Sequence, residues 1–217
     1  MKSDLTEIVF ILDRSGSMSG LESDTIGGYN SFLKKQKDAK GQAKVTTILF
    51  DDKYVKLHDG IDINEVTPIT EDDYFARGTT ALLDAIGKTI LDLGIKLRDT
   101  VEEERPSRVI FVIITDGQEN ASREFTYEKV NEMISHQQNK YSWEFIFIGA
   151  NIDAVREAEN LGIKPSRASN YVADEQGTEV VYSSLAENIA LFRAEGQIEE
   201  DWSINISDDL NQRKGRF

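Results

Sequence analysis

Runs of apolar residues alternate along this chain with stretches in which apolar residues recur at every third or fourth position. Residues 8–12 and 109–114 contain no polar side chain, and residues 143–149 contain only Glu144 as a charged one. An unbroken apolar run of this length is typical of a strand that is buried on both faces of a parallel sheet. The pattern therefore predicts at least three buried strands.

Helical spacing appears between the predicted strands. The clearest stripe begins with Leu83, Ile86 and Ile90 and continues to Leu97, as expected for one face of an amphipathic helix. Thr126 precedes another such stripe and is a suitable residue to cap a helix. Shorter stripes predict helices around residues 21–33, 127–134, 152–161 and 181–192.

One strand pair departs from the alternation of strand and helix. Residues 45–50 and 54–57 are rich in β-forming residues and flank Asp51-Asp52-Lys53, which reads as a hairpin turn. We therefore expect a doubly wound α/β domain whose central sheet is mostly parallel, with one antiparallel edge strand and helices on both faces. We place this domain at residues 1–196, with its core at 4–161, and treat residues 197–217 as a C-terminal tail whose order the sequence does not decide.

The first predicted strand ends abruptly in polar residues. Asp13, Ser15 and Ser17 follow the apolar run at alternate positions. Ligands of open α/β sheets bind at the carboxyl ends of the strands, where these side chains lie. All three carry hard oxygen donors without sulfur or imidazole, which favours Mg²⁺, Mn²⁺ or Ca²⁺ over zinc or copper.

Three segments together resemble the von Willebrand factor A domain with its metal-ion-dependent adhesion site, of the intracellular microbial type. The first is the stretch around Asp13; the second, residues 77–86, is similar to the family's threonine loop and the helix after it. The third, residues 109–117, is similar to the family's fourth strand, which ends in the site aspartate. The segments occur in the family's order, and the resemblance extends over residues 4–161 and implies the Rossmann-like fold of the family.

The resemblance also implies a set of metal ligands. In the family, two serines and a threonine bind the ion directly, while one or both aspartates act through water. Carried over to this chain, the ligands are Asp13, Ser15, Ser17, Thr80 and Asp116. Thr79 remains the alternative to Thr80, which we prefer because the family's threonine lies six residues before an apolar helix position, here occupied by an isoleucine.

Other polar residues are not interpreted as direct metal ligands. Asp51 and Asp52 read as turn residues, and Asp84 reads as a first-turn helix residue that suits the helix dipole, with a supporting role at the metal as the alternative. Glu119 and Asn120 follow the site aspartate and are candidates for contacts with ligand or water. The two histidines, at positions 58 and 136, are too isolated in sequence to support a zinc site.

Composition narrows the classes of partner. The formal net charge of −14 opposes direct binding to nucleic acid or to anionic membranes. Cysteine is absent, which excludes disulfides and thiolate ligands within this sequence and fits a reducing compartment. The first seven residues turn acidic before any apolar segment and lack the pattern of a secretory signal, so we expect a cytoplasmic protein.

The function expected from these features is cation-dependent protein binding rather than catalysis. Hydroxyl ligands leave a bound Mg²⁺ short of electrons, so that an Asp or Glu carboxylate of a partner protein can complete its coordination. The resemblance implies membership of a larger assembly, with any ATPase on a separate chain because no phosphate-binding Gly-Lys-Ser/Thr loop occurs here. Two alternatives stay open: an Mg²⁺-dependent phosphatase-like hydrolase, in which Thr115 would serve, and a scaffold with a vestigial metal site.

Overall fold

The computed structural model describes residues 1–214, and within them six strands form one sheet in the order β3-β2-β1-β4-β5-β6. Strand β3 pairs with β2 in the antiparallel direction, and every other neighbouring pair in this sheet is parallel. This arrangement confirms the predicted fold class, including the antiparallel edge. The strands are β1 (Lys2–Asp13), β2 (Gln42–Phe50), β3 (Tyr54–Asp62), β4 (Pro106–Thr115), β5 (Glu144–Gly149) and β6 (Ala168–Asn170).

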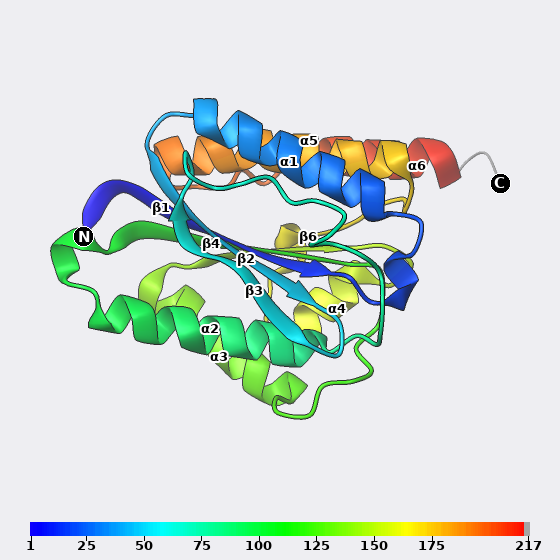
Figure 1. Cartoon of the computed structure of the whole chain (residues 1–217), viewed down its shortest axis with the longest axis horizontal. Helices are drawn as coiled ribbons and strands as arrows, with labels where there is room; N and C mark the ends of the chain where they lie inside the picture. Colours follow the sequence, from blue (N-terminus) through cyan, green and yellow to red (C-terminus); the bar gives the residue numbers. More distant parts are fainter. Residues whose placement is uncertain (215–217) are drawn as a thin grey trace.

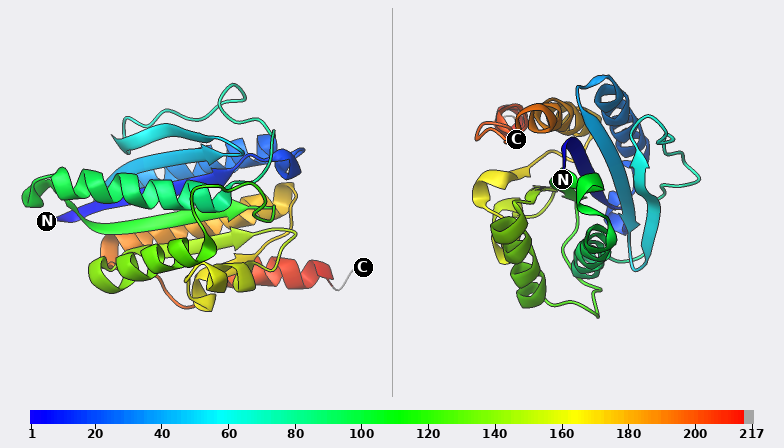
Figure 2. Two further views of the ribbon diagram at one scale, coloured as in Figure 1. Left: turned by 90° about the horizontal axis from the view of Figure 1, so that it is seen from below. Right: turned by 90° about the vertical axis from the view of Figure 1, so that its left-hand side faces the viewer.

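Helices cover both faces of the sheet (Figure 1). One layer consists of α1 (Glu22–Asp38), α5 (Glu175–Glu195) and α6 (Ile204–Lys214), and the other of α2 (Leu82–Asp99), α3 (Tyr127–Tyr141) and α4 (Ala154–Asn160). Figure 2, on the right, shows the two layers separated by the sheet. None of these helices, all within residues 1–214, is both long and apolar enough to cross a bilayer. Short 3-10 helices lie at η1 (Gly16–Met18), η2 (Glu102–Glu104) and η3 (Pro165–Arg167).

The apolar run of β1 supplies both halves of the core. Phe10 points into the cluster that includes residues of α1 and α5, where it packs edge-on against Tyr29 and Phe32. Val9 and Ile11 point into the opposite cluster, which includes residues of α2. Each fully buried side chain of this size stabilises the fold by roughly 1.5–3 kcal/mol. Because successive side chains of a strand alternate between faces, a run without polar residues requires cover on both sides.

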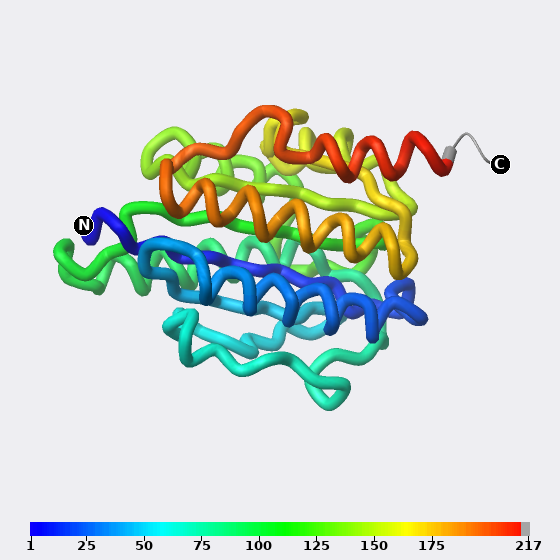
Figure 3. The backbone as a smooth tube through the Cα atoms, turned by 90° about the horizontal axis from the view of Figure 1, so that it is seen from above, coloured from blue at the N-terminus to red at the C-terminus, as the bar shows by residue number. Residues whose placement is uncertain are grey.

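Residues after α5 pack against the first helical layer. Trp202 is buried in the same core cluster as Phe10, and its indole Nε1 donates a hydrogen bond to the carbonyl oxygen of Ser166 at 2.8 Å. Ile206, on α6, is buried with it. Figure 3 shows α1 and α5 side by side along their length, with α6 beyond α5. The predicted tail is therefore folded as far as residue 214, and residues 215–217 lie outside the described part of the chain.

The parallel pairing brings three loops to one edge of the sheet. Asp13 is in register with Phe50 of β2, and the preceding Leu12 is in register with Ile114 of β4. The carboxyl ends of these strands therefore lie side by side, and the loops that leave them at residues 14–21, 51–53 and 116–126 meet there. The loop before α2 also reaches this edge, because Gly16 N donates a hydrogen bond to the carbonyl oxygen of Gly78 at 3.1 Å.

Candidate metal centre

Asp13 ends β1 with its carboxylate almost fully buried. Its Oδ1 accepts a hydrogen bond from the backbone N–H of Ser15 at 2.6 Å, and its Oδ2 accepts one from the Thr115 hydroxyl at 2.6 Å. Burial raises the pKa of Asp13 to about 6, although these two hydrogen bonds act in the opposite direction. The carboxylate is thus held rigidly in a place where its own charge is poorly solvated, which favours a nearby cation.

The two predicted serines converge beside this carboxylate. Ser15 Oγ and Ser17 Oγ lie 3.1 Å apart, and Ser17 Oγ donates a hydrogen bond to Asp116 Oδ1 at 2.6 Å. Asp116 follows β4 and is also buried, and burial raises its pKa while the Ser17 hydroxyl lowers it. Side chains from the loops after β1 and β4 therefore form one polar group of oxygens.

Gly117 marks the space between the hydroxyls. A Cβ atom built on this glycine would lie 3.0 Å from Ser17 Oγ, 3.0 Å from Thr80 Oγ1 and 3.7 Å from Ser15 Oγ. Three hydroxyl oxygens from two separate loops are thus directed at a single point. A side chain larger than hydrogen at position 117 would crowd that point.

Thr80, rather than Thr79, contributes to this convergence. Thr80 is buried and its backbone N–H donates to Asn120 Oδ1 at 2.9 Å, which fixes the orientation of the loop. Thr79 is exposed and lines a separate polar cavity of about 500 Å³ between the β2–β3 turn and the start of α2. All five residues predicted as metal ligands therefore lie at one edge of the sheet, with their hydroxyl or carboxylate groups gathered there.

The geometry of these oxygens suits a small divalent cation. With Mg²⁺–oxygen bonds of about 2.1 Å, neighbouring ligand oxygens of an octahedral site lie about 3 Å apart. The Ser15–Ser17 separation of 3.1 Å is close to that value. Among the described residues no group of three or more His, Cys, Asp or Glu side chains could hold a metal ion, so any site here depends on hydroxyl donors. Two carboxylates with three hydroxyls form a donor set that fits Mg²⁺ or Mn²⁺.

The loop after β4 is attached to the start of α2 by reciprocal hydrogen bonds. Glu119 accepts from the backbone N–H of Leu83 at 2.9 Å, and Asp84 accepts from three successive N–H groups at residues 123–125. Asn120 is bound to Thr80 as described above. Glu119 and Asn120, which the sequence suggested as ligand contacts, therefore face α2 and position the threonine loop. Asp84, on α2, supports the same contact by binding the backbone of the loop after β4.

Sequence reasoning missed a cluster of charged residues next to the site. Asp51 lies in the predicted hairpin turn, yet its carboxylate is fully buried between two guanidinium groups. Its Oδ2 lies 2.9 Å from Arg14 Nε and 2.7 Å from Arg77 Nε. Arg14 immediately follows the site aspartate, and this adjacency in the sequence is the signal that could have placed it next to the site.

No model of a known protein family matches this sequence, and no curated protein matches it either. Solved structures do match the fold with high probability, among them a von Willebrand factor type A structure from Catenulispora acidiphila. That structure is 11% identical, with a TM-score of 0.56, and the match covers 86% of this chain and 42% of the other. The chain has the von Willebrand factor A fold.

Two other structures with this similarity contain metals by their own description. Proximal thread matrix protein 1 from the mussel byssus, with a zinc-occupied MIDAS motif, has a TM-score of 0.56 and 18% identity over 88% of this chain. Manganese-loaded TRAP protein from Plasmodium vivax has a TM-score of 0.58 and 16% identity over 83% of this chain and 73% of its own. This chain spans about half the length of the mussel protein, 47%. At these identities the similarity concerns the fold alone.

Proposed function

We propose that this chain is a cation-dependent protein-binding module. In this proposal Asp13, Ser15, Ser17, Thr80 and Asp116 hold one Mg²⁺ ion, with Mn²⁺ or Ca²⁺ as alternatives, directly or through water. The observation that supports it most strongly is the convergence of three hydroxyl oxygens on one point in front of Gly117, beside two buried carboxylates. Solved structures of the same fold with occupied metal sites add support by analogy.

The donor chemistry suggests what the site recognises. Three of the five donors are neutral hydroxyls. A cation bound directly by these hydroxyls, with the two aspartates acting through water, would stay short of electrons on its open side. A bound cation would supply a Lewis-acidic position for an oxygen ligand from outside. We propose that this ligand is an Asp or Glu carboxylate of a partner protein, as part of a larger cytoplasmic assembly. An ATPase on a separate chain remains one candidate for that partner.

Thermal unfolding with and without metal tests the cation site. A ligand that binds only the native state stabilises it by about 2.7 kcal/mol at a hundred times its Kd. We expect Mg²⁺ or Mn²⁺ to raise the Tm of the wild type and expect Ser15→Ala and Thr80→Ala to remove most of that increase. Ser19→Ala and Thr79→Ala are matched controls, because both side chains are exposed in the same two loops. Equal metal responses in all five proteins would refute the site.

The proposal assigns no reaction to the chain. In a haloacid-dehalogenase-like hydrolase a second aspartate stands two residues after the nucleophile, and Ser15 occupies that position here. Thr115, which would serve in that reaction, donates its hydroxyl to Asp13 Oδ2. An assay with an aryl phosphate and Mg²⁺ tests this statement. Turnover that disappears in Asp13→Asn would contradict the proposal and favour the hydrolase.

A further inference from the structure

The Arg14–Asp51–Arg77 cluster carries more positive than negative charge. The guanidinium groups of Arg14 and Arg77 both lie within 3 Å of Asp51 Oδ2. The other carboxylate oxygen, Oδ1, accepts a hydrogen bond from the backbone N–H of Lys53 at 2.7 Å. One carboxylate compensates only one guanidinium, so these three side chains by themselves carry about one positive charge at neutral pH, and Asp52 Oδ1 lies close to Gly78 in the adjoining turn.

The two arginines differ in their access to solvent. The side chain of Arg14 is 4% exposed, whereas that of Arg77 is 36% exposed. Among the described residues, the Arg77 guanidinium donates a hydrogen bond through Nε, to Asp51, and neither of its Nη atoms donates one. The uncompensated charge of the cluster is therefore accessible at Arg77.

An exposed aromatic ring lies against the same two arginines. Phe75 is 41% exposed, and the guanidinium carbons of Arg77 and Arg14 lie 5.1 and 5.5 Å from its ring centroid. Contacts of this kind attract a guanidinium to the ring, weakly at exposed sites. Arg77 is thus held by Asp51 through its Nε, with an exposed apolar ring beside its guanidinium.

Backbone hydrogen bonds join this cluster to the metal-site loop. Arg77 N donates to the carbonyl oxygen of Arg14 at 2.9 Å, and Gly16 N donates to the carbonyl oxygen of Gly78 at 3.1 Å. Arg77 is therefore attached directly to the loop that carries Ser15 and Ser17. The backbone of the segment that carries Arg77 and Phe75 is thus fixed next to the loop that carries the serines.

We propose that the partner presents two acidic groups, one that completes the metal centre and one that pairs with Arg77 beside Phe75. This inference rests on the proposed function, because it describes a second contact of the same binding surface. An Arg–carboxylate pair at a half-exposed position strengthens binding modestly and can select among acidic segments. Segments with a single acidic residue would bind through the metal alone.

Short peptides test the two contacts separately. The probes are blocked peptides with two aspartates separated by zero to three glycines, and matched peptides in which one or the other aspartate is replaced by asparagine. Titration calorimetry or NMR with Mg²⁺-loaded protein measures both sets, and chelator provides the metal-free reference. We expect one spacing at which the diacidic peptide binds at least about threefold more tightly than both of its asparagine partners, the size expected of an exposed ion pair.

Variants then assign the preference to Arg77. Arg77→Gln should reduce the diacidic preference to about twofold, the statistical factor for two aspartates that can each reach the metal, while its metal-dependent binding of the asparagine peptides shows that the site is intact. Arg123→Gln is the matched control, since it removes the same charge from a residue that lines the separate polar cavity. It should retain the preference.

A measurement on the wild type makes the test independent of folding of the variant. The Nε–Hε NMR signal of Arg77 should shift with the diacidic peptide of the preferred spacing and not with its asparagine partners. Metal-dependent binding of all peptides with a diacidic preference no greater than the statistical factor of about two, or equal loss of the preference in Arg123→Gln, would overturn the inference and leave the proposed function intact. Absence of metal-dependent binding with every peptide, together with no metal effect on Tm, would overturn the proposed function itself.

Discussion

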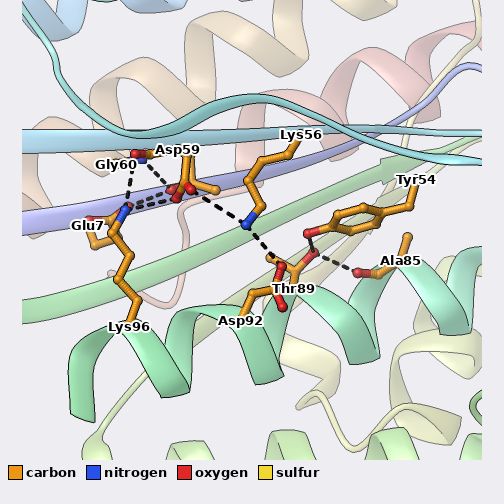
Figure 4. A network of polar contacts seen from close by, with 10 residues as sticks. Glu7, Tyr54, Lys56, Asp59, Gly60, Ala85, Thr89, Asp92 and Lys96 are labelled. Carbon is orange, nitrogen blue, oxygen red and sulfur yellow. Dashed lines mark hydrogen bonds and ion pairs between the residues drawn. The ribbon is translucent and has the colours of Figure 1, made fainter. Parts of the chain in front are cut away.

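Strand β1 carries two buried carboxylates that have opposite surroundings. Asp13, at its carboxyl end, lies among hydroxyl groups at the edge of the sheet, whereas Glu7, midway along the strand, lies beneath the β2–β3 hairpin and α2. Figure 4 shows Lys96 reaching from α2 to Asp59 close to Glu7. Burial raises the pKa of both β1 carboxylates, and each accepts a hydrogen bond from a threonine of a neighbouring strand.

The difference lies in what else is near each carboxylate. Lys96 Nζ, which donates to Asp59 Oδ1 at 2.8 Å, also lowers the pKa of Glu7 through its charge. Glu7 therefore has a cation from this chain, while Asp13 has only neutral donors in contact and a second carboxylate, Asp116, close by. A buried acid with an internal cation is a structural element. A buried acid without one, at the end of a strand, is a candidate for an external cation.

The largest expected effect is on metal binding. Asp13→Asn should abolish the metal-induced increase in Tm, because it removes the charge at the centre of the donor set. Glu7→Gln makes the same chemical change elsewhere on β1 and should leave the increase unchanged. Thermal unfolding with and without Mn²⁺ measures this increase in both variants. A similar loss in the two would show that the response depends on the general stability of the sheet.

A smaller change at the glycine tests the shape of the site. Gly117→Ala places a methyl group 3.0 Å from Ser17 Oγ and Thr80 Oγ1 and should weaken metal binding by about tenfold or more, as changes around metal sites do. Gly94→Ala, in α2, has no heavy atom within 4 Å of the new carbon. It should leave metal affinity unchanged and stabilise the helix by about 1 kcal/mol. Unchanged metal affinity in Gly117→Ala would place the cation elsewhere.

The two threonine donors sharpen the comparison further. Thr115→Val and Thr46→Val each remove a hydroxyl that donates to a β1 carboxylate, at 2.6 and 2.7 Å respectively. Each should lower the free energy of unfolding by about 1 kcal/mol, measured in urea. Metal affinity should fall only in Thr115→Val, because Asp13 then loses the bond that orients it. Equal metal affinities in the two variants would show that Thr115 does not act through Asp13.

Local sequence patterns predicted most of the fold and the residues that gather at the site. Strands β1, β4 and β5 were visible because burial on both faces leaves apolar runs, and the serines were visible because they follow one of these runs directly. The Arg14–Asp51–Arg77 cluster was not visible, since its members come from three loops that only the folded sheet brings together. Glu7 was missed for the same reason: an acid just before an apolar run looks exposed until α2 and the hairpin cover it.

The smallest expected effect concerns the pH dependence of stability at Glu7. Its pKa is raised by burial and partly restored by the Thr46 hydrogen bond and by the charges of Lys96 and Lys44, while Asp59 raises it further. A raised native pKa means that the protonated form is favoured by folding. The contribution of Glu7 is therefore fully present below its unfolded pKa of about 4.5 and is lost as the pH rises through the native value.

Glu7→Gln should remove this loss, because the amide stays neutral at every pH. We expect the variant to gain stability over the wild type as the pH rises above about 4.5, by roughly 1 kcal/mol at pH 7, the scale of desolvating one polar group. Urea unfolding between pH 4 and 8, with metal absent, measures the difference. Glu103→Gln, on the exposed η2 turn, is the control and should show no such trend. A variant that is less stable than the wild type at pH 7 would show that the charge of Glu7 is compensated by Lys96 after all, and the contrast with Asp13 would then be sharper than proposed.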